Sequence, residues 1–282
     1  MSRRPDAATD SVLRGDLLHT RDCVDAVRGQ DTIIHLAARG AVSETSAGET
    51  ARAYRLAVEG TRNLVHAALH EGVRRLVVAL PPPTALAVRS GARRDLLVEL
   101  DVARVRGLDV RTLSHGVPIG AHDVGPSWLG RAMLRYAAGD MRSFAAGAMS
   151  LVPATDVGKA AAQLANDDTL QGSAFVLPSA LVNVRQLFEM WADEVGPRSR
   201  PYERPRLLTA TRWGPLHHWV RRHLPEDFDP RLFSDFAPAP RGIRDAVSLP
   251  RHDTVGNAIA EAFAWFARHG HVRSARVRSF AS

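Results

Sequence analysis

The 282-residue sequence predicts an α/β fold built on a parallel sheet. Short apolar or β-branched segments, typical of buried strands, occur at 32–36, 75–80 and 109–113, and segments with apolar residues at helical spacing lie between them at 49–71 and 95–106. Strands that alternate with helices of this length indicate β-α-β units, whose strands run parallel. The chain is long enough for one large domain with a smaller lobe.

Glycines support the boundaries of these elements. A short helix is expected first, over 22–27, before the strand at 32–36. The long helix 49–71 is followed by Gly72, and the helix 95–106 by Gly107. Glycine is favoured directly after a helix, because it adopts the left-handed backbone conformation at no steric cost.

After residue 115 the alternation is less regular. Residues 151–160 predict a strand followed by a helix, with Asp156 as the N-cap. A strand is then expected at 173–177, and a helix at 183–195 that Gly196 closes. The remaining expected elements are a helical patch at 213–223, inside a proline- and arginine-rich stretch, and a last amphipathic helix at 254–269.

Composition excludes several classes of protein. The sequence has no run of 18 apolar residues and no apolar segment behind its basic start, so we expect neither a membrane span nor a signal peptide. The single Cys23 forms no intrachain disulfide, which favours a cytoplasmic location. The net charge is +7, but the basic residues are nearly all arginine and are spread along the chain. We therefore expect no nucleic-acid partner.

Four motifs occur in a fixed order: Gly15-Asp16-Leu17, the segment Asp31 to Ala38, Gly60-Thr61-Arg62-Asn63-Leu64, and the segment Val73 to Val78. Their order and spacing resemble the nucleotide-binding domain of the extended short-chain dehydrogenase/reductase family, which includes NAD-dependent epimerases/dehydratases and dihydroflavonol-reductase-like proteins. The resemblance implies a Rossmann-type parallel sheet with a small C-terminal lobe and NAD or NADP as cofactor. It covers about residues 5–195 well and the remainder weakly.

In that family, Gly-Asp-Leu follows a first strand, a glycine-rich turn, a helix and a second strand, whereas here it starts at residue 15. The sequence also contains no G-x-G or G-x-x-G, because its two closest glycines, Gly116 and Gly120, are four positions apart. We therefore expect the first strand-helix-strand unit to be missing, through a missed upstream start codon or a true truncation. The expected domains are a truncated NAD(P)-binding domain at 1–150 and substrate-lobe segments at 151–282.

The resemblance assigns five cofactor-binding residues. Asp16 would bind the adenine amine and Leu17 would pack on the ring, while the backbone of Leu36, Ala37 and Ala38 would pass the ribose and pyrophosphate. A structural role is the alternative for three of them: Asp16 could cap the following turn, and the two alanines could pack against a helix.

Family enzymes use a Tyr-x-x-x-Lys pair, in which the lysine lowers the pKa of the tyrosine so that the phenol can exchange a proton. The only lysine here is Lys159, and none of the three tyrosines (Tyr54, Tyr136 and Tyr202) has a lysine four positions later. Alignment on Glu99 puts Gly91 at the tyrosine position and Asp95 at the lysine position. The sequence therefore predicts no catalytic residue of the usual kind.

Two weak catalytic candidates remain. His115 is expected at the C-terminal end of a strand, with His122 and Asp123 nearby in sequence, although a hydrogen-bonded structural histidine is the alternative. Thr84 is the one hydroxyl close to the family's serine position. The histidines at 217, 218 and 223 lack the spacing that presents metal ligands on one helix face, so no metal site is predicted.

Two functions follow from this resemblance. The first is an NAD(P)-dependent epimerase/dehydratase or reductase family protein that acts on a small carbonyl, sterol-like or sugar-type substrate. The second is a catalytically inactive relative that serves as a cofactor-sensing or partner-binding protein, or a truncated gene product. The expected partners are a small-molecule substrate and, as a candidate assembly, a second copy in a homodimer.

Overall fold

The structure is a computed structural model that describes residues 12–36, 47–80, 91–144, 146–198, 201–203 and 254–272. These residues form two compact units. Of the described residues, the first unit holds those up to His115 together with 158–177, and the second unit holds the others. Each unit has its own sheet, and chain segments on both sides of residue 150 contribute to both units.

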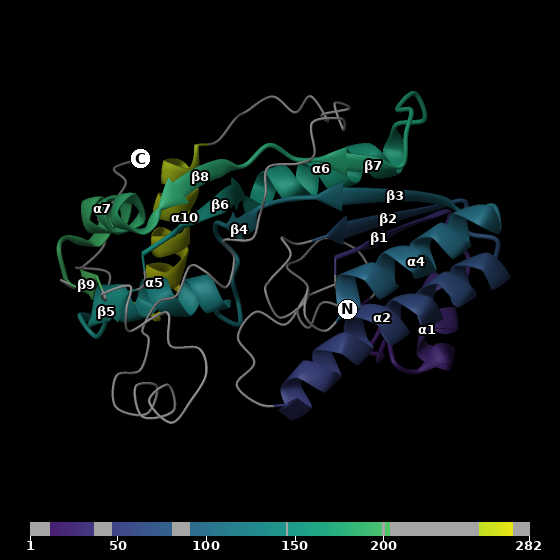
Figure 1. Cartoon of the computed structure of the whole chain (residues 1–282), viewed down its shortest axis with the longest axis horizontal. Coiled ribbons are helices and arrows are strands. Elements are labelled where there is room, and N and C mark those ends of the chain that lie inside the picture. Colours follow the sequence, from purple (N-terminus) through teal and green to yellow (C-terminus); the bar gives the residue numbers. More distant parts are fainter. Residues whose placement is uncertain are drawn as a thin grey trace. The chain divides into compact units, whose positions relative to one another are not determined.

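A parallel four-stranded sheet forms the centre of the first unit (Figure 1). Its strands are β1 (Thr32–His35), β2 (Arg75–Leu80), β3 (Asp109–Ser114) and β7 (Ala174–Val176), in the order β1-β2-β3-β7. Ile34 pairs with Val77, and Val77 with Arg111. This sheet confirms the predicted α/β, Rossmann-type fold class. Among the described strands, β1 lies at one edge.

Alternation along the strands divides the sheet into two faces. Leu76, Val78 and Val110 are buried in one hydrophobic cluster with side chains of α1 (Thr20–Val27), α2 (Ala47–His70) and α4 (Ala92–Val105), which Figure 1 shows grouped together. The intervening residues Arg75 and Arg111 instead bond to carbonyls near the end of α6 (Ala154–Asn166). A strand's successive side chains point to opposite faces, so α6 and the other three helices meet different faces.

The second unit contains a smaller sheet in the order β4-β6-β8, formed by β4 (Val117–Ile119), β6 (Ala148–Pro153) and β8 (Ala180–Asn183). A two-stranded pair joins β5 (Ser143–Phe144) to β9 (Tyr202–Glu203). The helices described in the second unit are α5 (Trp128–Ala138), α7 (Val184–Val195) and α10 (Val255–Arg268). Tyr136, Phe144, Phe188 and Trp191 pack their rings together in its core.

The predicted elements lie close to their expected boundaries, whereas α5 and the strands β4, β5, β8 and β9 were not predicted. One predicted residue role needs correction. Asp156 is not the N-cap of its helix, because α6 begins at Ala154, directly after β6 ends at Pro153. No loop separates the strand from the helix, so Asp156 lies in the first helical turn. An acidic residue in this turn interacts favourably with the helix dipole. The helical patch at 213–223 lies outside the described residues. The functional division at residue 150 stays a prediction.

Within the described part of the chain, no helix combines the length and the apolar character that crossing a bilayer requires.

Candidate functional site

The segment Gly15-Asp16-Leu17 is held against helix α2 by residues of the third motif. The backbone carbonyl of Leu17 accepts a hydrogen bond from Asn63 Nδ2 at 3.0 Å. A Cβ added at Gly60 would lie 3.0 Å from Leu17 Cβ, so the glycine permits the close approach. Leu17 is half-buried and packs on the hydrophobic cluster of the sheet. The first and third motifs are therefore parts of one local structure.

Asp16 caps the turn before α1, as the structural alternative proposed. Its Oδ1 accepts a hydrogen bond from the backbone N–H of Leu18 at 3.0 Å, and its own backbone N–H donates to Asp22 Oδ2 at 2.7 Å. The side chain is exposed, and its second oxygen accepts no hydrogen bond from the described residues. Capping and an adenine contact are therefore compatible, because they use different oxygens.

The other predicted cofactor residues lie at the end of the edge strand. Leu36 directly follows β1, and 58% of it is exposed, which is high for a leucine at the end of a parallel strand. Ala37 and Ala38 lie outside the described residues, as does the catalytic candidate Thr84.

His35 connects the second motif to the third. Its Nε2 lies 3.1 Å from Thr61 Oγ1, and the Thr61 hydroxyl already donates to the carbonyl of Ala57 at 2.7 Å. The threonine oxygen must therefore accept from His35, so the imidazole carries its proton on Nε2. Burial lowers the pKa of His35 to about 4, and the ring is neutral at physiological pH. This histidine is structural.

His115 follows strand β3 and is buried; its backbone N–H donates to the carbonyl of Leu80 at 3.3 Å. Asp123, a suggested neighbour, is engaged elsewhere: both of its carboxylate oxygens accept from the backbone N–H of Ser127, at 2.9 and 2.8 Å, just before α5. His122 is the one described residue other than glycine with a positive φ, at 67°. A catalytic role for His115 stays a prediction.

Tyr54 contacts Asp95, the residue that aligns with the family's catalytic lysine. The phenol of Tyr54 on α2 donates to Asp95 Oδ2 on α4 at 2.8 Å, across 41 positions of sequence. This hydrogen bond to a carboxylate raises the pKa of Tyr54, whereas a lysine would lower it. The pair joins two helices and makes the phenol a poorer proton-exchange group at neutral pH. Sequence spacing could not reveal it, because the two residues come from different helices.

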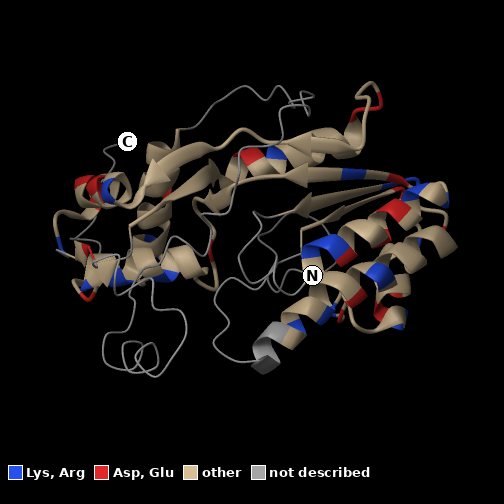
Figure 2. Ribbon diagram, viewed as in Figure 1, with Lys and Arg blue, Asp and Glu red and all other residues tan. Residues whose placement is uncertain are grey.

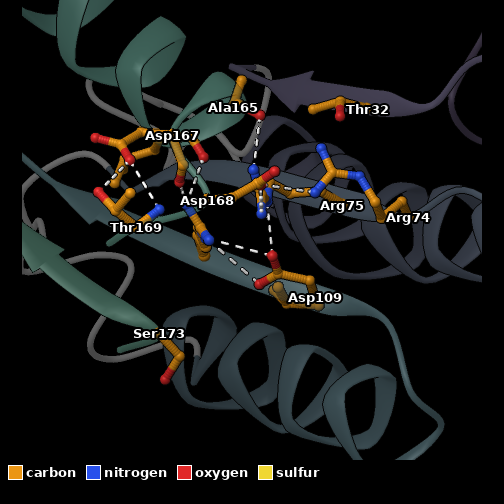
Figure 3. Close-up of polar contacts among 12 residues, drawn as sticks. Thr32, Arg74, Arg75, Asp109, Ala165, Asp167, Asp168, Thr169 and Ser173 are labelled. Carbon is orange, nitrogen blue, oxygen red and sulfur yellow. Dashed lines mark hydrogen bonds and ion pairs between the residues drawn. The ribbon is translucent and has the colours of Figure 1, made fainter. Parts of the chain in front are cut away.

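At the N-terminal ends of β2 and β3, a network of arginines and aspartates surrounds the end of α6 (Figure 3). Arg75 donates to Asp109, to the carbonyl of Ala165 and to Asp168, at 2.6, 2.9 and 2.6 Å. Arg111 donates to the carbonyls of Leu164 and Asp167, at 3.0 and 2.6 Å. Both guanidinium groups are buried and bond to groups of the protein itself, so the network is structural. Among the described residues, no group of His, Cys, Asp or Glu side chains could hold a metal ion.

The sequence of this chain is similar to those of known proteins. Residues 3–79 match the model of the 3-beta hydroxysteroid dehydrogenase/isomerase family. Sterol demethylase protein B of Methylococcus capsulatus is 28% identical over an alignment of 291 positions, which covers 92% of this chain and 85% of that protein. The resemblance to the extended short-chain dehydrogenase/reductase family is confirmed.

Solved structures of a sugar-nucleotide epimerase and a dehydratase share the fold of this chain. A nucleoside-diphosphate-sugar epimerase from Pseudomonas aeruginosa superposes with a TM-score of 0.67 at 17% identity, covering 92% of this chain and 83% of its own. A dTDP-glucose 4,6-dehydratase from Streptomyces venezuelae, solved with NAD bound, gives a TM-score of 0.61 at 17% identity, with coverages of 92% and 80%. The bound NAD belongs to the dehydratase structure, and the two likenesses show a shared fold.

Proposed function

We propose that this chain is an NAD(P)-dependent epimerase/dehydratase or reductase family protein whose substrate is a small carbonyl compound. The observation that carries the proposal is the Asp16-Leu17 turn, which Gly60 and Asn63 hold against α2 while the Asp16 side chain stays exposed. Similarity to a sterol demethylase protein over 92% of the chain favours a sterol-like carbonyl over a sugar nucleotide.

The described residues fit the nucleoside end of the cofactor better than its pyrophosphate. Asp16 would accept a hydrogen bond from the adenine amine, and Leu17 and the exposed Leu36 would offer apolar surface to the adenosine. The sequence contains no closely spaced glycines for a turn that directs backbone N–H groups at phosphate oxygens. When bound, NAD(P) would supply hydride transfer.

We expect the chain to bind NADH and NADPH weakly, with a dissociation constant of about 100 μM or more, because the main anchor of the pyrophosphate is absent from its sequence. Titration calorimetry measures this affinity. Asp16→Ala should abolish the residual binding. The control Asp25→Ala removes an exposed carboxylate on α1 that forms ion pairs with Arg21 and Arg28, and it should have no effect. Low-micromolar binding, or binding that survives Asp16→Ala, would contradict the proposed adenosine site.

A specific observation favours the second function, a catalytically inactive relative that senses the cofactor or binds a partner. The phenol nearest to the family's catalytic position is bound to a carboxylate, which disfavours its ionised form. Loss of a positioned acid or base typically costs on the order of 10²–10⁴-fold in rate.

Turnover distinguishes the two functions. If the proposed function is right, NADPH-dependent reduction of sterol ketones proceeds at saturating cofactor, and Tyr54→Phe leaves its rate unchanged because Asp95 already binds the Tyr54 phenol. The absence of turnover would favour the inactive relative. A stopped-flow assay of NADPH absorbance measures both rates. Rapid turnover would reject the inactive alternative, and His115→Ala would then be the first variant to test, since His115 is the titratable side chain that follows β3.

A further inference from the structure

His122 has a backbone conformation that most side chains avoid. Its φ of 67° lies in the left-handed region, and no other described residue apart from glycine has a positive φ. The Cβ of an L-residue then lies close to the following carbonyl oxygen, a contact that glycine avoids and that asparagine offsets with local hydrogen bonds. Residues held in such conformations are concentrated at ligand-binding and catalytic sites, so His122 is a candidate for a functional role.

The loop between β4 and α5 fixes the chain on the C-terminal side of His122. The backbone N–H of Val124 donates to the carbonyl of His122 at 2.9 Å. The Asp123 carboxylate accepts from the backbone N–H of Ser127, directly before α5 begins. A Cβ added at Gly130 would collide with this carboxylate, so glycine leaves room for it. The conformation of His122 is therefore imposed by its surroundings.

The side chain of His122 has an aromatic support. His122 is exposed, and the centroid of its imidazole lies 6.3 Å from that of the Trp265 indole on α10. Only 4% of Trp265 is exposed, and the ring of His269 stacks on it with a centroid distance of 4.1 Å. The loop thus holds an exposed histidine against a buried ring whose position is fixed by packing.

The position of His122 in the fold is one where ligands bind. His122 lies three positions after the end of β4, which pairs in parallel with β6. Ligands of open α/β sheets bind beyond the carboxyl ends of parallel strands. Helix α5, which follows the loop, contains two arginines and no carboxylate (Figure 2), and its Arg131 donates to the carbonyl of Pro126 in the loop at 2.7 Å. This positive charge favours a ligand atom that accepts hydrogen bonds over a cation.

We propose that His122 binds the substrate, by donating a hydrogen bond from its imidazole to a carbonyl or carboxylate oxygen of a small molecule. The inference rests on the proposed function, which supplies a carbonyl compound as the substrate. It assigns a substrate contact to the second unit, whereas the sequence indicated His122 only as a neighbour of His115. For the turn alone, glycine or asparagine would serve better, and the imidazole explains why a histidine is present instead.

Binding of progesterone, a steroid ketone that serves as the probe, tests this contact. Tryptophan fluorescence of the full chain measures the binding, since Trp265 lies beside the site. We expect His122→Gly and His122→Asn to raise the dissociation constant roughly five- to tenfold, which corresponds to one hydrogen bond. Both variants should melt at or above the temperature of the unchanged protein, because they adopt the backbone conformation with less strain. His66→Asn, the same change at an exposed histidine on α2, should alter neither quantity.

The outcome is separate from that of the proposed function, because binding is measured without NADPH and without turnover. Progesterone that binds through His122 but is not reduced would reject the proposed reaction and support this site. Unchanged binding in both variants would overturn the proposal, as would a failure of the unchanged protein to bind progesterone. Lower melting temperatures in both variants would also overturn it, since the imidazole would then serve only to pack the loop against Trp265.

Discussion

Replacing Arg75 with methionine should lower the free energy of unfolding by about 3 kcal/mol, measured by denaturant titration at neutral pH. Only 3% of this side chain is exposed, and its guanidinium makes three hydrogen bonds. Methionine retains much of the apolar stem but removes every donor. The carbonyl of Ala165 at the end of α6 is then buried without this donor, and desolvating a polar group without a partner is costly.

The neighbouring arginine provides the matched control. Arg74 also bonds to Asp168, at 2.8 Å, and to Asp31, but 44% of its side chain is exposed, as is about 70% of each partner (69% and 70%). Water replaces most of what such an exposed pair contributes, so Arg74→Met should cost less than about 1 kcal/mol. Equal losses from the two substitutions would show that burial of Arg75 and its bond to the α6 carbonyl do not matter.

Hydrogen exchange should locate the effect of Arg75→Met. Faster exchange is expected around the end of α6, where Arg75 and Arg111 donate to the carbonyls of Leu164, Ala165 and Asp167. Helix α10, in the second unit, should exchange as in the unchanged protein. Uniformly faster exchange would indicate a global effect instead.

The burial of Arg75 and Arg111 could not be predicted from the sequence, although the strands that contain them could. Periodicity and helix-ending glycines predicted the strands at 75–80 and 109–113 and the helices around them, because these signals are local. Nothing local indicated that Arg75 and Arg111 would be buried inside the strands. Their burial depends on carbonyls about ninety and fifty positions later in the chain, which fold back over the sheet.

The candidate site likewise combines residues that the sequence motifs singled out with a pair that they could not indicate. The resemblance assigned Asp16 and Leu17 to the adenine of a cofactor, which stays a prediction. The structure adds that Gly60 and Asn63 hold the turn that carries these two residues. The Tyr54–Asp95 pair could not be predicted, because its residues meet only through the packing of α2 on α4. Helix α5 was missed because it follows an irregular stretch, where the alternation of strands and helices no longer guides assignment.

Acidification from pH 7.5 to pH 5 should remove about 2 kcal/mol of stability through His35 alone. Burial lowers the pKa of this histidine from 6.5 to about 4, so the folded state disfavours the charged ring that the unfolded chain accepts. Because the folded pKa is the lower one, the stabilisation is complete above pH 6.5. It declines as the pH falls from 6.5 towards 4, and it is absent below that.

Denaturant titrations of the unchanged protein and of His35→Gln at both pH values isolate this contribution. Glutamine can still donate to Thr61 but does not titrate. Asp31, Asp95 and Asp168 have pKa values lowered below 3.8 by their hydrogen bonds, so they remain charged throughout this range. The other histidines are common to both proteins and cancel in the comparison. His35→Gln should be less stable at pH 7.5, because its shape differs, but should lose about 2 kcal/mol less between the two pH values. If both proteins lose the same amount, His35 is not the buried neutral group that links the second and third motifs.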